Sequence, residues 1–334
     1  MTVSIIIANY NGRKFLPRLC HSLCLQSFKN FEVIFVDNSS SDSSLDYIKT
    51  KYPKFKIIKT QNKGYGHGCN IGAKLAKGKF LIFLNPDMYC PKNFLKNLLN
   101  YRHEIEKKNP GQSIGAIGLQ LIDFNSKLKN ARLITFNKLD IFGNTRDFTT
   151  PNPEDKSIII PGSPFLIKKT VYLETKGFNS NIFLYGEEVE YCWRLTILGY
   201  NNFMSSQQHL FHYGSGIVGK TNGKKIALMV YGNLIACYTN YSNLSLLLIL
   251  PLYTIYYLCL TFGSILITKF KFEYFNELLK IIPQFIHNLG NINKIRTFTQ
   301  KHRQISDWQF KKHFSIIPAV IARKSYQTIA SAQT

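Results

Sequence analysis

The first half of the sequence predicts a doubly wound α/β fold, in which a parallel sheet is covered by helices on both faces. Two observations support this fold class: short, almost wholly apolar runs recur along the chain, and stretches of helical spacing separate them. Apolar runs without alternation are typical of parallel strands that are buried on both faces. Strands that alternate with helices form right-handed βαβ units.

Four strands and three connecting helices follow from this pattern. The strands are expected at 3–8, 31–36, 55–59 and 80–84, and the helices at 15–26, 42–52 and 68–77. In the first helix Phe15, Leu19 and Leu23 share one side, while Lys14 and Arg18 give it polar character. The first half of the chain is therefore expected to be a doubly wound α/β sandwich.

Each expected strand is followed by polar, turn-forming residues. These segments are Asn9 to Gly12, Asp37 to Ser40, Asn62 to Gly68 and Asn85 to Asp87. Because the carboxyl ends of parallel strands meet at the edge where open α/β sheets bind ligands, the four segments should form a crevice of nucleotide size. Asp37 can accept hydrogen bonds from a pyrimidine N–H or a ribose hydroxyl, and Tyr10 can lie flat against a base. Asp37 could equally cap a helix, and this alternative stays open.

Asp87 is a candidate metal ligand. Pro86 biases Asn85 away from helix, so the strand should stop there and leave the Asp87 side chain free. A carboxylate in that place can bind Mg²⁺ or Mn²⁺ held on a diphosphate. Taken alone, the tripeptide Asn85-Pro86-Asp87 is more typical of a plain β-turn than of a metal site.

The glycine cluster Gly64 to Gly68 disfavours one class of enzyme. It is similar to a dinucleotide-binding fingerprint, but Cys69 stands where the third glycine should be, and the cluster follows the third strand rather than the first. A nicotinamide-dependent dehydrogenase is therefore a poor interpretation.

Further segments continue the pattern in order along the chain. They are Gly162, Gly177-Phe178, Glu187 to Arg194 and His212 to Ser215. Together with the strand ends, with Asn70 and with Gly72, these residues resemble the inverting family 2 glycosyltransferases of GT-A fold, and among them the rhamnosyltransferase-like branch. The resemblance covers roughly residues 2 to 216.

The resemblance implies a role for each matching residue. Asp37 would contact the nucleoside, Asp87 the metal-diphosphate, and Glu188 would be the catalytic base; His212 would be a further metal or diphosphate contact. The donor-binding residues implied are Asn9, Tyr10, Asn11, Asp37, Asn62, Gly64, Asn70 and Asn85. Two departures stand out, because many members have Asp-x-Asp where this chain has Asn85-Pro86-Asp87, and the usual Glu-Asp pair is here Glu187-Glu188.

The reaction that the resemblance implies is inverting transfer of one sugar from a nucleotide-diphosphate donor to a hydroxyl of a lipid-linked or polymeric glycan. The cofactor would be Mg²⁺ or Mn²⁺. The branch points to dTDP-rhamnose, with UDP-hexose or UDP-N-acetylhexosamine as the alternative. A protein of another class, a catalytically silent membrane-bound adaptor, would keep the fold for binding only.

The expected helix over 187–198 gives Glu188 an independent argument. Glu188, Cys192 and Leu195 share one stripe, so this carboxylate faces the apolar side, whereas Glu190 and Arg194 form an outward i,i+4 pair. An inward carboxylate tends to have a raised pKa and can take a proton from an acceptor hydroxyl. The alternative is that the glutamates complement the helix N-terminus.

Three positions in these motifs fit structural roles. Judged without the resemblance, His212 is more typical of a structural histidine. Trp193 and Phe178 are expected in the core.

Composition indicates an anionic partner in the cytoplasm. The seven cysteines form no ligand-like cluster and are odd in number, which favours reduced thiols, and the chain starts directly with a strand, so no signal peptide is expected. The formal net charge is +23, which favours a membrane surface or nucleic acid. No recognisable nucleic-acid module is present, so the inner membrane surface is the expected partner and nucleic acid is not.

The C-terminal third supports a membrane partner. Residues 226–268 contain no Asp, Glu, Lys or Arg, and 244–268 is long enough to span a bilayer. Residues 269–334 carry eleven basic and three acidic residues, and one crossing would place this basic tail outside. We therefore expect interfacial or re-entrant helices on the cytoplasmic face, with Tyr253, Tyr256 and Tyr257 at the headgroups. A true span and a buried helix pair are the alternatives. The expected domains are 1–220, a GT-A domain, and 221–334, a helical membrane-associated region.

Overall fold

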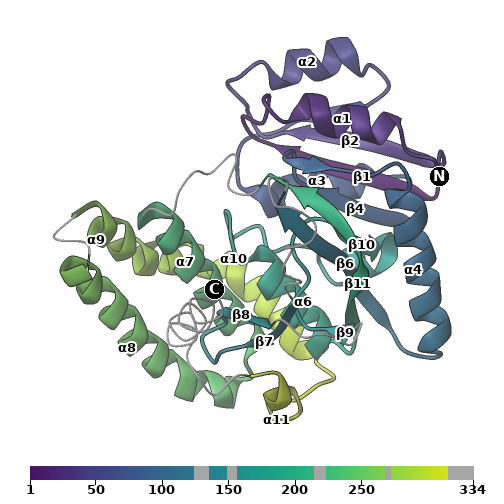
Figure 1. Cartoon of the computed structure of the whole chain (residues 1–334). Helices are drawn as coiled ribbons and strands as arrows, with labels where there is room; N and C mark the ends of the chain where they lie inside the picture. Colours follow the sequence, from purple (N-terminus) through teal and green to yellow (C-terminus); the bar gives the residue numbers. More distant parts are fainter. Residues whose placement is uncertain (124–134, 149–155, 214–222, 268–271, 315–334) are drawn as a thin grey trace, which may run out of the picture.

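The computed structural model describes residues 1–123, 135–148, 156–213, 223–267 and 272–314 (Figure 1). The four expected strands are present as β1 (Val3–Asn9), β2 (Phe31–Asp37), β3 (Lys56–Lys59) and β4 (Phe80–Leu84). The helices between them are α1 (Leu16–Cys24), α2 (Ser44–Lys51) and α3 (Tyr65–Leu75). The four strands pair in parallel in the order β3-β2-β1-β4, which confirms the doubly wound arrangement.

The sheet continues beyond β4 as a mixed sheet, which the sequence did not predict. Its order is β3-β2-β1-β4-β10-β6-β11-β5, and β9 pairs with β11. The added strands are β5 (Met88–Tyr89), β6 (Ile114–Asp123), β9 (Lys156–Ser157), β10 (Phe165–Lys168) and β11 (Asn201–His212). β10 runs antiparallel to both β4 and β6, so it is a single reversed strand between two strands that run in the same direction.

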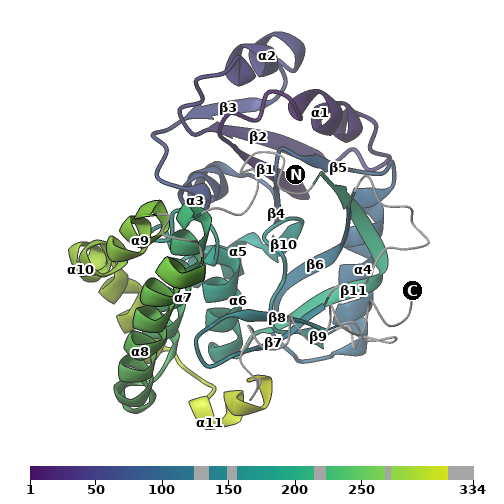
Figure 2. The same cartoon turned by 60° about the vertical axis from the view of Figure 1, so that its left-hand side comes forward.

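Helices cover both faces of the sheet (Figures 1 and 2). Ile5 and Ile7 of β1 pack with α1, α2 and α4 (Phe94–Lys108), whereas Ile6 packs on the other face with α3, α5 (Lys169–Glu174) and α6 (Glu187–Ile197). Alternate residues of one strand are thus fully buried in two different cores. This explains why the run is almost wholly apolar, with Ser4 as the one polar residue before Asn9.

The C-terminal helices are α7 (Gly223–Asn240), α8 (Asn243–Ile267), α9 (Phe272–Leu279), α10 (Ile281–Lys301) and α11 (Asp307–Phe310), followed by a short 3-10 turn at Lys311–His313. Val230, Tyr231 and Ile235 of α7 belong to the same apolar cluster as Ile6 of the sheet. One continuous core therefore crosses the expected domain boundary near residue 220. The division into two domains remains a prediction.

A hairpin of β7 (Thr135–Leu139) and β8 (Thr145–Phe148) links the sheet region to these helices. Its turn reaches α7, where the Asn233 side chain donates to Asn144 Oδ1 at 2.8 Å and the Tyr241 hydroxyl to the carbonyl oxygen of Ile141 at 2.9 Å. The ring of Phe142 stacks on Tyr256 of α8, with centroids 4.6 Å apart. The hairpin turn is therefore held by both helices.

The tyrosines of α8 do not lie where the sequence placed them. Tyr253 and Tyr257 are 2% and 5% exposed. Their hydroxyls donate to the carbonyl oxygens of Val230 in α7 and Leu278 in α9, at 2.7 and 2.6 Å. The expectation that these two rings mark the headgroup level is wrong, because they fasten α8 to its neighbours. Among the described residues one segment, Asn243–Gly263, is long and apolar enough to cross a membrane.

Candidate functional site

Four side-chain oxygens at the ends of β1, β2 and β4 have no hydrogen-bond partner among the described residues. They belong to Asn9, Asp37, Asn38 and Asp87, and all four atoms are buried. Buried acceptors are rarely left unpaired in native proteins. A group of them at the edge where open α/β sheets bind ligands fits donors or a cation from outside the protein, either water or a bound molecule.

The loops that carry these oxygens contact one another. The backbone N–H of Asn38 donates to the carbonyl oxygen of Asn9 at 2.8 Å, and the Asn9 amide donates to Ser40 Oγ at 3.0 Å. The Ser40 N–H in turn donates to Asp37 Oδ2 at 3.3 Å. A Cβ built on Gly12 would lie 3.0 Å from Cβ of Pro86. The ends of the three strands thus form one continuous surface, and Asp37 Oδ1 has no partner among the described residues.

Asp87 and His212 are brought together, as the sequence analysis placed them in one site. Asp87 Oδ2 lies 3.2 Å from His212 Nε2, and Asp87 is 6% exposed. The cause is the short strand β5, which begins directly after Asp87 and pairs Met88 with His212 on β11. The Tyr213 N–H also donates to the Asp87 carbonyl oxygen at 3.1 Å.

This pair fits a divalent cation that is shared with another ligand. Asp87 Oδ1 is buried and unpartnered, so one carboxylate oxygen is available for a cation. Within the described ranges no group of three or more His, Cys, Asp or Glu side chains could hold a metal ion. A Mg²⁺ or Mn²⁺ ion here would need further oxygen ligands, such as those of a diphosphate and water.

Glu187 and Glu188 open helix α6, directly after Gly186 with φ 94°. Glu187 is 6% exposed and its Oε2 atom has no partner, whereas Glu188 is partly buried. Burial raises the pKa of Glu187 well above its ordinary value, and the Glu188 charge adds to this rise. Burial also raises the pKa of Glu188. The more deeply buried carboxyl is therefore Glu187, which the stripe argument did not place inward.

A short segment at 162–163 joins this helix to the strand ends. A Cβ built on Gly162 would lie 3.9 Å from Cβ of Glu188. The Gly162 carbonyl oxygen accepts from the Tyr65 hydroxyl of α3 at 3.1 Å, and Ser163 Oγ accepts from the Asn85 N–H at 2.9 Å. Glu188, the start of α3 and the Asp87 loop therefore border the same candidate site.

The expected pair Glu190–Arg194 forms, but it is not outward. Both side chains are 0% exposed, and Glu190 Oε2 lies 2.9 Å from Arg194 Nη2. Thr239 Oγ1 of α7 donates to Glu190 Oε1 at 3.1 Å, and the Asn240 amide donates to the Glu190 carbonyl oxygen at 3.1 Å. The outward placement is wrong because α7 covers this face of α6. Trp193 and Phe178 are 0% and 1% exposed, which confirms them as core.

Three of the implied donor-binding side chains are used inside the protein. Asn11 Oδ1 accepts from the Ser41 N–H at 2.8 Å, and Asn62 Oδ1 from the Gly64 N–H at 3.3 Å. The Asn70 amide donates to the Phe178 carbonyl oxygen at 2.7 Å and accepts from the Tyr172 hydroxyl at 2.6 Å. These contacts shape the loops around the strand ends.

Tyr10, Asn85 and Gly64 differ in how accessible they are. Tyr10 is 45% exposed, and Asn85 is partly buried. Gly64 has φ 101°, and a Cβ there would collide with the Phe183 backbone, so this position needs glycine.

Sequence reasoning missed Asn38 and Ser163 as site residues. Asn38 could have been found, since it directly follows Asp37 in a polar strand end. Ser163 carries no comparable signal, because its role depends on the antiparallel strand β10 beside β4.

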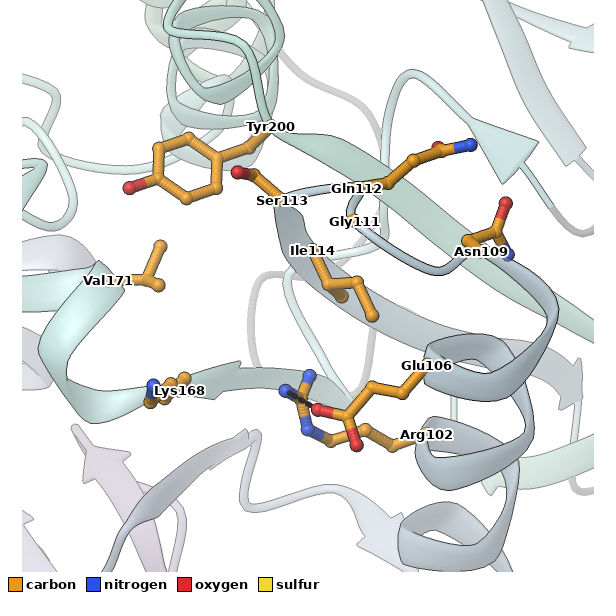
Figure 3. Close-up of a pocket in the computed structure, with 10 residues that line it drawn as sticks. All are labelled: Arg102, Glu106, Asn109, Gly111, Gln112, Ser113, Ile114, Lys168, Val171 and Tyr200. Carbon is orange, nitrogen blue, oxygen red and sulfur yellow. Dashed lines mark hydrogen bonds and ion pairs between the residues drawn. The ribbon is translucent and has the colours of Figure 1, made fainter.

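A separate cavity of about 350 Å³ lies at the other end of the sheet (Figure 3). It is lined by Arg102 and Glu106 of α4, by Lys168 at the end of β10 and by Tyr200, among others. Lys168 pairs with Phe80, the first residue of β4, so the cavity lies away from the carboxyl ends of β1, β2 and β4. Arg102 already pairs with Glu106 at 2.6 Å. None of the site residues implied by the sequence lines it.

Comparison with known proteins gives a family for part of the chain. Residues 4–153 match the model of glycosyl transferase family 2. Poly(ribitol-phosphate) beta-N-acetylglucosaminyltransferase TarS of Staphylococcus aureus is 33% identical over 103 residues, 29% of this chain and 18% of that protein. The Escherichia coli UDP-Glc:alpha-D-GlcNAc-diphosphoundecaprenol beta-1,3-glucosyltransferase WfaP is 36% identical over 108 residues, 31% and 42% of the two chains. The chain thus spans less than half the length of these relatives.

Solved structures share the fold. The structure of GalNAc-T7 with UDP, GalNAc and Mn²⁺ has a TM-score of 0.64 at 16% identity, over 94% of this chain and 57% of that one. Staphylococcus aureus TarS 1-349 in complex with UDP has a TM-score of 0.53 at 16% identity, over 90% and 91%. At these identities the likeness is one of fold, a GT-A-like mixed sheet.

Proposed function

Because residues 4–153 match the model of glycosyl transferase family 2, we propose that the protein transfers a sugar, with inversion, from a UDP-sugar to a hydroxyl of a polymeric or lipid-linked glycan. The main support is the group of unpartnered buried oxygens on Asn9, Asp37, Asn38 and Asp87. Acceptors of this kind suit the N–H and O–H groups of a nucleoside and a cation on its diphosphate.

The donor is proposed from the relatives. TarS has been solved in complex with UDP-GlcNAc, and WfaP is named for UDP-Glc. Both names favour UDP-hexose or UDP-N-acetylhexosamine over dTDP-rhamnose, which was the first expectation from the sequence. The same names describe a polymeric and a diphosphoundecaprenol-linked acceptor.

In the proposed complex Asp37 accepts hydrogen bonds from the nucleoside, and Asp87 with His212 would hold Mg²⁺ or Mn²⁺. When bound, the cation would supply positive charge against the leaving diphosphate. Tyr10 is exposed at the end of β1, where it can cover the base. Asn85 and Gly64 lie in the loops that border the same place.

Glu188 is proposed as the general base. The acceptor oxygen forms a bond to the anomeric carbon as the bond to the diphosphate breaks, and the proton of the acceptor hydroxyl goes to the Glu188 carboxylate. A raised pKa suits this task, because it brings the carboxylate closer to the basicity needed at neutral pH. Burial and the Glu188 charge raise the pKa of Glu187 well above its ordinary value, which favours the neutral form of this carboxyl beside the base.

We place this reaction at the cytoplasmic face of the membrane. The net charge of +23 attracts anionic lipid, and an apolar helix accompanies the catalytic sheet. The proposed partners are the nucleotide-sugar donor, the glycan acceptor and the membrane surface, without nucleic acid.

A panel of UDP-Glc, UDP-GlcNAc and dTDP-rhamnose tests the proposal. Full-length protein should show a higher thermal midpoint with a UDP-sugar and Mn²⁺ than with the sugar and EDTA, and it should release UDP in the presence of acceptor glycan. A response to dTDP-rhamnose alone would overturn the proposed donor. Binding without release or transfer would favour the silent adaptor.

A further inference from the structure

One face of α8 is exposed and largely apolar, with Thr254 at its edge bonded to the carbonyl oxygen of Leu250. Its large side chains follow helical spacing, and several are among the most exposed apolar groups of the described chain: Leu244 is 74% exposed, Leu247 72% and Leu248 68%. The outer face of α8 consists of Leu244, Leu247, Leu248, Leu252, Ile255, Leu258 and Phe262. An apolar surface of this extent marks a contact site.

The opposite face of α8 is fixed to the protein along its length. Tyr253 bonds to α7, Tyr257 bonds to α9, and Tyr256 stacks on Phe142 of the β7–β8 hairpin. A helix that crossed a bilayer alone would have to give up these contacts. Taking its neighbours along would carry Asp140 of the same hairpin into hydrocarbon, where a charged group is costly. The packing therefore favours a helix that lies along a surface.

The net charge of the chain distinguishes between two partners for this apolar face, a second copy of the chain and an anionic membrane. Two copies of a chain with a net charge of +23 repel each other, whereas an anionic bilayer attracts it. The described helix α8 contains no charged residue, and basic groups stand at the ends of its neighbours. Lys224 is the second residue of α7, and Lys280 directly follows α9; both are exposed, and Lys280 pairs with Glu277 at 2.5 Å. This arrangement of apolar and basic groups is typical of interfacial helices.

We propose that the outer face of α8 inserts into one leaflet of an anionic membrane, with the helix lying in the plane of the membrane. This deepens the membrane location proposed above, but it stands independently of sugar transfer, because vesicle binding is measured without donor.

Co-sedimentation of the full-length protein with vesicles tests the surface. Binding to vesicles containing phosphatidylglycerol should be at least tenfold tighter than to phosphatidylcholine alone, and Leu248→Glu with Ile255→Glu should weaken it at least tenfold. Leu25→Glu, at a site 52% exposed after α1, is the matched control and should bind as the wild type does. Unchanged binding by the double variant would overturn the proposal. So would a dimer in the absence of lipid that the same variant dissociates, since a second copy would then cover this face.

Depth measurements separate an in-plane helix from a spanning one. Cys24 and Cys259 are the exposed thiols, and the other five cysteines are buried. In a Cys24→Ser, Cys259→Ser background, a polarity-sensitive fluorophore is attached to Leu248→Cys, Ile255→Cys or Phe262→Cys. If brominated lipids show the fluorophores at all three positions to lie at the same depth, the proposal is supported. A maximum at residue 255 with shallow ends would show a span and overturn it.

Discussion

Replacing Arg194 with Met is expected to lower the free energy of unfolding by about 3–5 kcal/mol. The Arg194 and Glu190 side chains are both 0% exposed, and breaking a buried pair leaves one charge uncompensated. Glu190 would keep Thr239 as a side-chain partner. The carbonyl oxygens of Thr175 and Gly177 would lose their guanidinium donor. If the pair lay outward, as the sequence of α6 suggests, the loss would be about 0–1 kcal/mol.

Urea unfolding followed by tryptophan fluorescence measures this difference, because Trp193 is buried one residue before Arg194. Glu277→Gln is the control, since it removes the i,i+3 pair with Lys280, whose side chain is 65% exposed. The control should change the free energy of unfolding by less than about 1 kcal/mol. If Arg194→Met lowers the free energy of unfolding by less than about 1 kcal/mol, the conclusion that α7 buries the Glu190–Arg194 pair is refuted.

The remaining predictions concern the site and the helical region. Asp87→Asn should abolish transfer and weaken Mn²⁺-dependent donor binding in calorimetry while the thermal midpoint stays near that of the wild type; full activity would exclude Asp87 as the metal ligand. Glu188→Gln should lower turnover about 10²–10⁴-fold with donor affinity unchanged; if Glu187→Gln is the inactive variant instead, the base is Glu187. Because the pKa of Glu188 is raised, kcat/KM should fall as the pH drops through a value above that of an ordinary glutamate. The folded-state pKa of Glu187 is also raised, so burial disfavours folding increasingly as pH rises above the unfolded pKa, and Glu187→Gln should stabilise the protein at neutral pH but not near pH 4 in thermal melts. Removal of residues 221–334 should expose Glu190 and Arg194 and lower the thermal midpoint; an unchanged midpoint would show that residues 1–220 fold alone.

The parallel half of the fold was predictable because its signal is local. β1, β2 and β4 are largely apolar runs, and β3 has Ile57 and Ile58 between two lysines. Each strand is followed by a polar strand end and then by a helical stretch. β10 could not be found in this way, since four residues inserted antiparallel between β4 and β6 depend on partners far away in the chain. The two-residue strand β5 has no sequence signal of its own, although it is the element that brings His212 to Asp87.

The faces of the helices were the least predictable feature. Glu190 and Arg194 have the spacing of a solvent-exposed pair, and only the packing of α7, which begins at Gly223, makes them buried. The tyrosines of α8 were misplaced for the same reason, because an aromatic hydroxyl can bond to water at a membrane surface or to a neighbouring carbonyl. In both cases the polar group found its partner in a segment that the local pattern does not contain.

The turn of the β7–β8 hairpin limits how this protein could be recombined with its relatives. Asn144 and Ile141 are bonded to Asn233 and Tyr241, and Phe142 stacks on Tyr256, so each contact joins segments about a hundred residues apart. A chimera that exchanges only the C-terminal helices would set a foreign helix surface against the native turn. Functional hybrids are therefore expected only when residues 139–145 and the helices that receive them are exchanged as one unit.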